Sequence, residues 1–167
     1  MNLFMAIRKK FRWYHPLSAA VLLFFYFIAI RPFRVAVNER WQLPLLEYYF
    51  HGRQAVILSS DSAGTGVLFQ IQGTGLEMVL AVPFGIVFLA FACALLLTAS
   101  PLRYFFLLLL VHLSVYAVSL GLVFISGFAT PKIIQMVPAV QHYALIAASF
   151  AILFFSLRQE EIGVSGD

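Results

Sequence analysis

Charged residues and cysteine are both scarce in this chain. Only 11% of its 167 residues are charged, 7 of them acidic, and it contains 1 Cys. A soluble domain is about 25% charged, so these few charges cannot cover the outside of a globule of this size. A single cysteine excludes an intrachain disulfide. The composition therefore excludes an ordinary soluble enzyme, a disordered chain and a nucleic-acid-binding protein.

The sequence also lacks any recognisable metal-binding motif. The sequence holds no zinc-type spacing of cysteine and histidine, and no acidic cluster that would bind a hard cation. Cys93 lies within an apolar run and is interpreted as a small packing residue. We therefore expect neither a metal nor a cofactor.

Apolar residues dominate instead. They make up 62% of the chain, which includes 18 Phe. Four apolar segments stand out, at about 16–30, 78–99, 104–126 and 133–157. The last three are long enough to cross about 30 Å of hydrocarbon as helices, and a helix satisfies its own backbone polar groups in lipid. The sequence predicts an all-α polytopic membrane protein with four transmembrane helices, forming a single domain over residues 1–167.

The first apolar segment is preceded by basic residues, Arg8, Lys9, Lys10 and Arg12. Lysine and arginine are enriched in cytoplasmic segments, which places the N-terminus in the cytoplasm. Four crossings return the C-terminus to the same side. No small-x-small cleavage site directly follows the first segment, so we interpret it as an uncleaved anchor.

The segment 31–77 is the sizeable part expected outside lipid, on the outer face. Its residues 38–50 have apolar residues at roughly helical spacing, and Pro44 is expected to prevent a clean helix from the start. We predict an amphipathic piece lying on the membrane surface. Residues 54–59 and 67–72 are predicted strands of a β-hairpin that leads directly into the second helix.

The junction between this hairpin and the predicted second helix is rich in glycine. Gly73 and Gly75 permit a sharp change of direction. Thr74 and Glu77 have the Thr-x-x-Glu spacing of a capping box, which by itself explains both residues. A reactive role for Thr74 is the alternative.

Two histidines fall within the predicted membrane helices, His112 and His142. A helix pair with one histidine each is able to hold a b-type haem. At 1.5 Å per residue, however, their depths differ by roughly 10 Å. We expect each histidine to bond to a neighbouring helix; a haem-binding electron-transfer subunit is kept as one alternative function.

The order of features from about residue 41 to residue 157 resembles the exosortase/archaeosortase family of membrane transpeptidases. The features are the apolar piece 43–47 (LPLLE), the strand pair, a Gly-x-Gly-Leu helix start at 73–76, a short basic turn, and a last helix that carries His142. The resemblance implies a bacterial or archaeal cytoplasmic (inner) membrane. It also implies a site built from a Cys-Ser-Gly-type motif that opens the helix after the strand, an arginine and a histidine.

The resemblance carries over at one of these three positions. His142 matches the histidine, Thr74 falls where the cysteine is expected, and the stretch 116–119 has no arginine. A threonine hydroxyl needs a strong adjacent base to become a nucleophile, and the missing arginine removes a cation that would stabilise an oxyanion.

These departures favour a non-catalytic, exosortase-like pseudoenzyme. Its expected role is that of an accessory or structural subunit, with the lipid bilayer and other integral membrane proteins as partners. The alternative is an active transpeptidase or protease that acts on C-terminally anchored proteins, with Thr74 as nucleophile and His142 as base.

Overall fold

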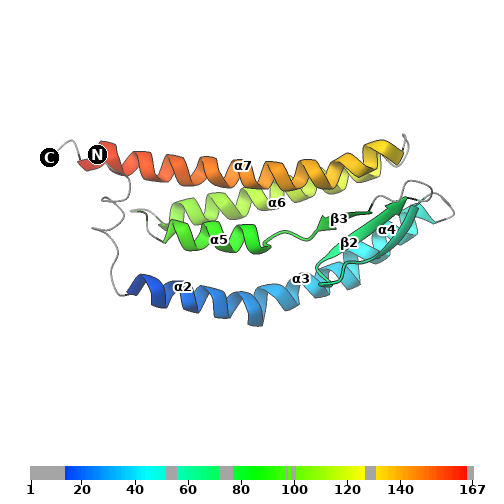
Figure 1. Cartoon of the computed structure of the whole chain (residues 1–167), viewed down its shortest axis with the longest axis horizontal. Coiled ribbons are helices and arrows are strands. Elements are labelled where there is room, and N and C mark those ends of the chain that lie inside the picture. Colours follow the sequence, from blue (N-terminus) through cyan, green and yellow to red (C-terminus); the bar gives the residue numbers. More distant parts are fainter. Residues whose placement is uncertain are drawn as a thin grey trace.

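The computed structural model describes residues 14–51, 56–71, 77–96, 98, 101–126 and 131–164. Long helices run side by side, and a small sheet packs among them toward one end (Figure 1). Within the described ranges, three helices are long and apolar enough to cross a membrane. These are His15–Phe50, Leu102–Ile125 and Met136–Arg158. The chain is therefore mostly helical and compatible with an integral membrane protein.

The first helix is a continuous rod from Tyr14 to Phe50, not a short span followed by a separate surface piece. It comprises α2 (Tyr14–Phe25), the π turn η1 (Tyr26–Ile30), α3 (Arg31–Val37), the π turn η2 (Asn38–Gln42) and α4 (Leu43–Phe50). The prediction that residues 38–50 lie on the membrane as a separate piece is thus wrong.

Each π turn stands directly before a residue that precedes proline. The N–H of Arg31 donates to the carbonyl of Tyr26, and the N–H of Leu43 donates to that of Asn38. Proline has no N–H and crowds the carbonyl four residues earlier, whereas a π turn accommodates one extra residue. The rod therefore continues through Pro32 and Pro44, which explains why Pro44 does not interrupt it.

The π turns also keep one face of the rod turned toward the rest of the protein. In a regular α-helix, 24 residues at about 100° each would leave Phe50 about 240° out of line with Tyr26. Each π turn takes up about one residue, or about 100°, so two of them reduce the offset to about 40°. From Tyr26 onward the buried side chains of the rod accordingly form one stripe, and they are Tyr26, Arg34, Asn38, Gln42, Leu46 and Phe50.

The sheet has three antiparallel strands in the order β1-β2-β3. They are β1 (Val56–Ser60), β2 (Gly66–Ile71) and β3 (Glu77–Ala81). The turn between β1 and β2 is held by the Asp61 carboxylate, which accepts from the backbone N–H of Thr65 at 2.6 Å and of Gly66 at 3.0 Å. Gly64 has φ +71 in this turn, a conformation that glycine adopts at little cost.

The second apolar segment is not a helix over 78–99, which corrects the sequence prediction. Its first residues form β3, residues 82–85 are not helical, and α5 (Ile86–Leu95) has only 10 residues. Apolar strands and buried helices cannot be distinguished by an apolar run alone. The residues at the start of this segment form a strand because they pair with β2. Pro83 and Gly85 lie before the first residue of α5, so neither interrupts a helix.

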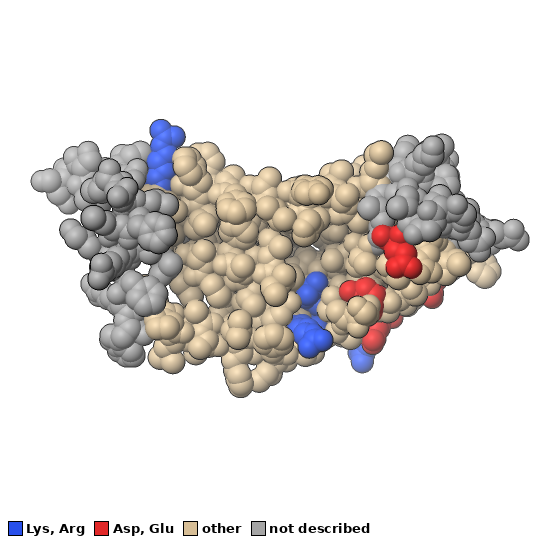
Figure 2. Space-filling model, viewed as in Figure 1, with Lys and Arg blue, Asp and Glu red and all other residues tan. Residues whose placement is uncertain are grey.

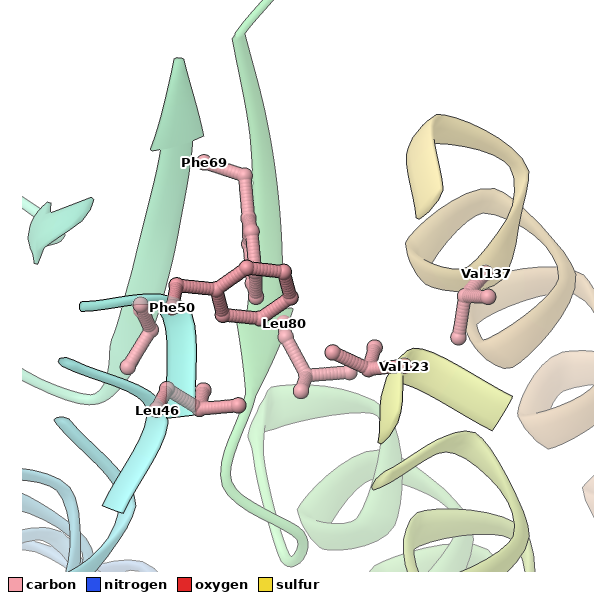
Figure 3. Packing of buried hydrophobic residues seen from close by; sticks show 7 residues of the cluster. Leu46, Phe50, Phe69, Leu80, Val123 and Val137 are labelled. Carbon is pink, nitrogen blue, oxygen red and sulfur yellow. The ribbon is translucent and has the colours of Figure 1, made fainter. Parts of the chain in front are cut away.

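The third and fourth apolar segments are helices, as predicted. They are α6 (Pro101–Ser126) and α7 (Pro131–Val164), and the helix continues through Pro138. Two apolar cores result. One joins the rod and the sheet to these helices through Leu46, Phe50, Val67, Phe69, Leu80, Val123 and Val137 (Figure 3). The other packs α5 against them through Phe88, Ala92, Leu95, Tyr104, Leu108 and Ile152.

Candidate functional site

A buried arginine of the rod holds the chain directly after β3. The Nε and Nη2 atoms of Arg34 donate to the carbonyl of Val82 at 3.1 and 2.9 Å. Its Nη1 donates to the hydroxyl of Tyr26 at 3.1 Å. Arg34 as a whole is 6% exposed. Both partners are neutral oxygens, so among the described residues these bonds orient the charge without neutralising it.

Two buried glutamines act on the same stretch of backbone from opposite helices. Gln42 of the rod donates to the carbonyl of Leu80 at 2.9 Å, and Gln141 of α7 donates to that of Ala81 at 3.1 Å. A backbone carbonyl without a hydrogen bond is costly in an apolar environment. We call Arg34, Gln42 and Gln141 the β3 clamp, because together they supply donors to three successive carbonyls of non-helical backbone.

Asn38 fixes the other side of the sheet to the rod. Its Nδ2 donates to Ser60 Oγ at 3.0 Å and to the Gly64 carbonyl at 3.1 Å. It therefore holds the end of β1 and the following turn. Asn38 lies one turn before Gln42 on the same face, so the rod contacts both edge strands of the sheet.

Replacing Asn38 by alanine is expected to lower the free energy of unfolding by about 1 to 3 kcal/mol, because two half-buried acceptors lose their donor. Glu39→Ala is the matched control, since Glu39 is the next residue and is exposed. Its effect is expected within about 0.5 kcal/mol. Denaturant unfolding in detergent measures both; equal losses in the two variants would contradict a role for Asn38 in holding the turn.

His112 is the buried histidine of α6, and it is 1% exposed. Its Nδ1 donates to the Leu108 carbonyl at 2.9 Å, whereas its Nε2 is buried and has no hydrogen-bond partner among the described residues. The ring lies against Phe84 and Phe88, with centroids 6.5 and 5.2 Å apart. His112 thus packs on the first turn of α5.

The residues between β3 and α5 adopt an unusual backbone. Phe84 has φ 65, which non-glycine residues rarely adopt. Gly85 is the N-cap of α5, with no side-chain capping bond. A Cβ at Gly85 would lie 3.3 Å from Nη2 of Arg34. The junction from Val82 to Gly85 is therefore where the Arg34 guanidinium, the His112 ring and the start of α5 meet.

The site residues predicted from the sequence, Thr74 and His142, are not found at this junction among the described residues. Thr74 lies outside the described residues. Glu77 begins β3, so the described part of the predicted capping box is in a strand and not in a helix. His142 is exposed on α7, and its ring contacts Tyr143 with centroids 5.9 Å apart.

The two histidines weighed for haem have different surroundings. His112 contacts aromatic rings of the α5 region, while His142 contacts its neighbour on α7. Among the described residues, no group of three or more His, Cys, Asp and Glu side chains is placed to hold a metal ion. Cys93 lies half-buried within α5.

Sequence reasoning missed the β3 clamp. Arg34 and Gln42 of the clamp are eight residues apart with Asn38 midway, and this spacing of four residues places polar side chains on one helix face, which is a signal for a polar stripe. The partners were not readable, because the carbonyls of Leu80 and Val82 are about 40 to 50 residues further along the chain.

Comparisons with known proteins find no similar protein. No family model matches the sequence, and no curated protein and no solved structure is significantly similar to the chain. The resemblance to exosortases stays a prediction.

Proposed function

We propose that this chain is a non-catalytic, exosortase-like integral membrane protein that serves as an accessory, structural subunit of a membrane protein complex. The observation that carries the proposal is the strand-to-helix junction. The resembled family places its nucleophile where the helix opens after the strand. In this chain α5 opens after Val82-Pro83-Phe84-Gly85, and none of these side chains is a nucleophile.

The polar groups around that junction support a structural role. Arg34, Gln42 and Gln141 each donate to carbonyls of the protein's own backbone. Each side chain is thereby committed to holding non-helical backbone within an apolar bundle, the condition under which such backbone is tolerated in a membrane. The clamp accounts for these buried polar residues without a substrate.

The large exposed apolar surface fits a chain surrounded by lipid and by partner helices. Exposed large apolar side chains occur on α2, α5, α6 and α7. We place the protein in a bacterial or archaeal cytoplasmic membrane with both termini in the cytoplasm and the sheet on the outer face. The three long helices make three crossings. The fourth combines α5, about 15 Å long, with the non-helical residues before it.

Purification of the tagged full-length chain from its native membranes in a mild detergent tests the accessory role. We expect a stoichiometric set of other integral membrane proteins to copurify, because a structural subunit is retained through its apolar surface. An unrelated four-helix protein with the same tag is the control. A chain that purifies alone, or with the same proteins as the control, would refute the proposal.

Two variants separate this proposal from the enzymatic alternative. Thr74→Ala and His142→Ala are expected to leave the processing of C-terminally anchored proteins unchanged at equal abundance of the chain. Loss of processing in both would establish the transpeptidase or protease instead. A Soret band in the absorbance spectrum of the purified protein would establish the haem-binding alternative.

A further inference from the structure

The turn between β1 and β2 lies beside the middle of the rod and not beyond its outer end. Asn38 donates to the Gly64 carbonyl at 3.1 Å, and a Cβ at Gly64 would lie 3.6 Å from the side chain of Val35. From Asn38 to Phe50 the rod continues for about 18 Å of helix. The hairpin therefore points its turn back along the rod, toward α3 (Figure 1).

The helix α6 is apolar at the level of this turn. At one end of this stretch of the rod, the junction that Arg34 holds lies against His112 of α6. At the other end, Leu46 packs in one cluster with Val123. These two positions of α6 are about 15 and 32 Å from Leu102, where its apolar span begins. Hydrocarbon is about 30 Å thick, so in the crossing proposed above the turn lies at a depth where α6 is surrounded by lipid.

The side of the rod that bears the turn is charged at the same depth. Glu39 follows Val35 by four residues, which places it on the face that the turn contacts, and Arg40 is the next residue. Both are exposed, as is Ser62 of the turn, and among the described residues no ion pair holds either charge. By contrast, α6 has no charged residue from 104 to 126. In Figure 2 acidic and basic side chains accordingly gather toward the end that carries the sheet, beside a broad uncharged surface.

A surface of this kind does not suit lipid. Non-helical backbone and charged side chains are tolerated at membrane depth only against protein or water. The exposed residues Arg40, Pro44 and Tyr48 continue the surface along the rod at a spacing of four residues, and Tyr48 is 85% exposed. Arginine and tyrosine are enriched in protein interfaces. The combination of both charges with an exposed aromatic residue therefore favours a protein partner over a water-filled cleft.

The charge pattern indicates which protein this partner is. Copies of one chain enter the membrane in the same orientation, so a twofold axis between two of them brings residues of equal depth together. Such an interface takes both members of each ion pair from one patch. Glu39 and Arg40 supply both signs at one depth and, as consecutive residues, do not face each other. We propose that this face of the rod joins two copies in a parallel dimer, in which Glu39 of each copy pairs with Arg40 of the other. The proposal rests on the membrane crossing proposed above and not on the accessory role.

Energy transfer between donor- and acceptor-labelled copies of the full-length chain in phosphatidylcholine vesicles tests the dimer. We expect transfer that persists as lipid is added and falls when unlabelled chain is in excess. Arg40→Glu and Glu39→Arg are each expected to weaken self-association by about tenfold or more, because each change replaces the ion pairs of the dimer by contacts between like charges. In dilute detergent, where the copies are separated, both variants are expected to unfold at the midpoint of the original chain.

Mixing the two variants distinguishes a lost interface from a lost fold. The Arg40→Glu chain has two acidic residues at this depth and the Glu39→Arg chain has two basic ones. Labelled copies of one variant are therefore expected to associate with copies of the other about as strongly as the original chain associates with itself. Misfolded chains would not recover on mixing. Arg103→Glu reverses an exposed cation near the start of α6 and is expected to associate as the original chain does.

Three results would overturn the proposal. They are transfer no greater than that of an unrelated membrane protein at the same density, losses in Arg103→Glu equal to those in Arg40→Glu, and no recovery when the two variants are mixed. A chain that is monomeric in vesicles but loses copurifying proteins on Arg40→Glu would assign this face to a different membrane protein. Self-association is measured on the purified chain and copurification in native membranes, so failure of this proposal and failure of the accessory role are distinguishable.

Discussion

Replacing Leu46 by alanine is expected to lower the free energy of unfolding by about 3 to 5 kcal/mol. Leu46 is 0% exposed and lies where the rod meets the sheet and the ends of α6 and α7. It comes from the opposite side to Val123 and Val137, with Leu80 of β3 between them (Figure 3). Truncating a buried leucine loses its transfer free energy and leaves a cavity. A site enclosed by three elements has little freedom to collapse.

The matched control is Leu45→Ala. Leu45 is the preceding residue of α4, with 47% of its surface exposed, and its truncation is expected to cost about 1 kcal/mol or less. Denaturant unfolding of both variants in the same detergent gives the comparison. Similar losses for the two positions would show that the cluster around Leu46 does not hold the sheet against the helices.

Gly66→Ala is expected to destabilise the protein by about 3 kcal/mol through loss of the contact between β2 and β3. A Cβ at this position would lie 2.8 Å from the Leu80 carbonyl oxygen, 2.8 Å from Cγ1 of Val79 and 3.0 Å from the Ala81 Cα. Two of these atoms belong to backbone, which cannot rotate away. Relief requires that the strands separate, and this is the costly form of overpacking.

Gly121→Ala serves as its control. Apart from neighbours in its own helix backbone, no heavy atom lies within 4 Å of a Cβ at Gly121, which is in the C-terminal part of α6. Alanine is the better helix former, so a gain of about 0.5 to 1 kcal/mol is expected. The same unfolding measurement decides. If Gly66→Ala were as harmless as Gly121→Ala, the close approach of β2 and β3 would not be a requirement of the fold.

Both predictions concern the attachment of β3, which links the sheet to the junction at Val82–Gly85 that Arg34 holds. Leu80 carries the apolar contact and accepts from Gln42, while Val82 accepts from Arg34. Variants that loosen β3 are therefore expected to disturb the Arg34 junction as well. Coupling of this kind is tested by a double-mutant cycle between Gly66→Ala and Arg34→Gln; strict additivity would show that strand and junction are independent.

The helical bundle was largely readable from the sequence. Residues 104–126 and 133–157 are long, uniformly apolar and free of competing turn signals, and both lie within helices α6 and α7. Their length and composition suffice, because a long apolar segment satisfies its backbone only as a helix. The membrane class of the protein follows from the same property, which needs no partner elsewhere in the chain.

The first rod and the second apolar segment were misjudged for identifiable reasons. Pro44 is normally a helix interruption, and the π turn that accommodates it has no recognised sequence signal. Met78–Ala81 is as apolar as a helix, but its pairing with β2 makes it a strand. The site residues predicted from the sequence, Thr74 and His142, are not part of the β3 clamp. The clamp joins residues of the rod and of α7 to β3 and the residue after it.

By itself the sequence determined the bundle, because hydrophobic length acts locally along the chain. Only the tertiary structure decided where α5 begins, which face of the rod is buried and which oxygens accept hydrogen bonds from Arg34. Those outcomes depend on contacts between segments distant in sequence, such as Arg34 with Val82 and Gln141 with Ala81. Most buried donors in a protein are hydrogen-bonded, and the fold selects the acceptor of each one.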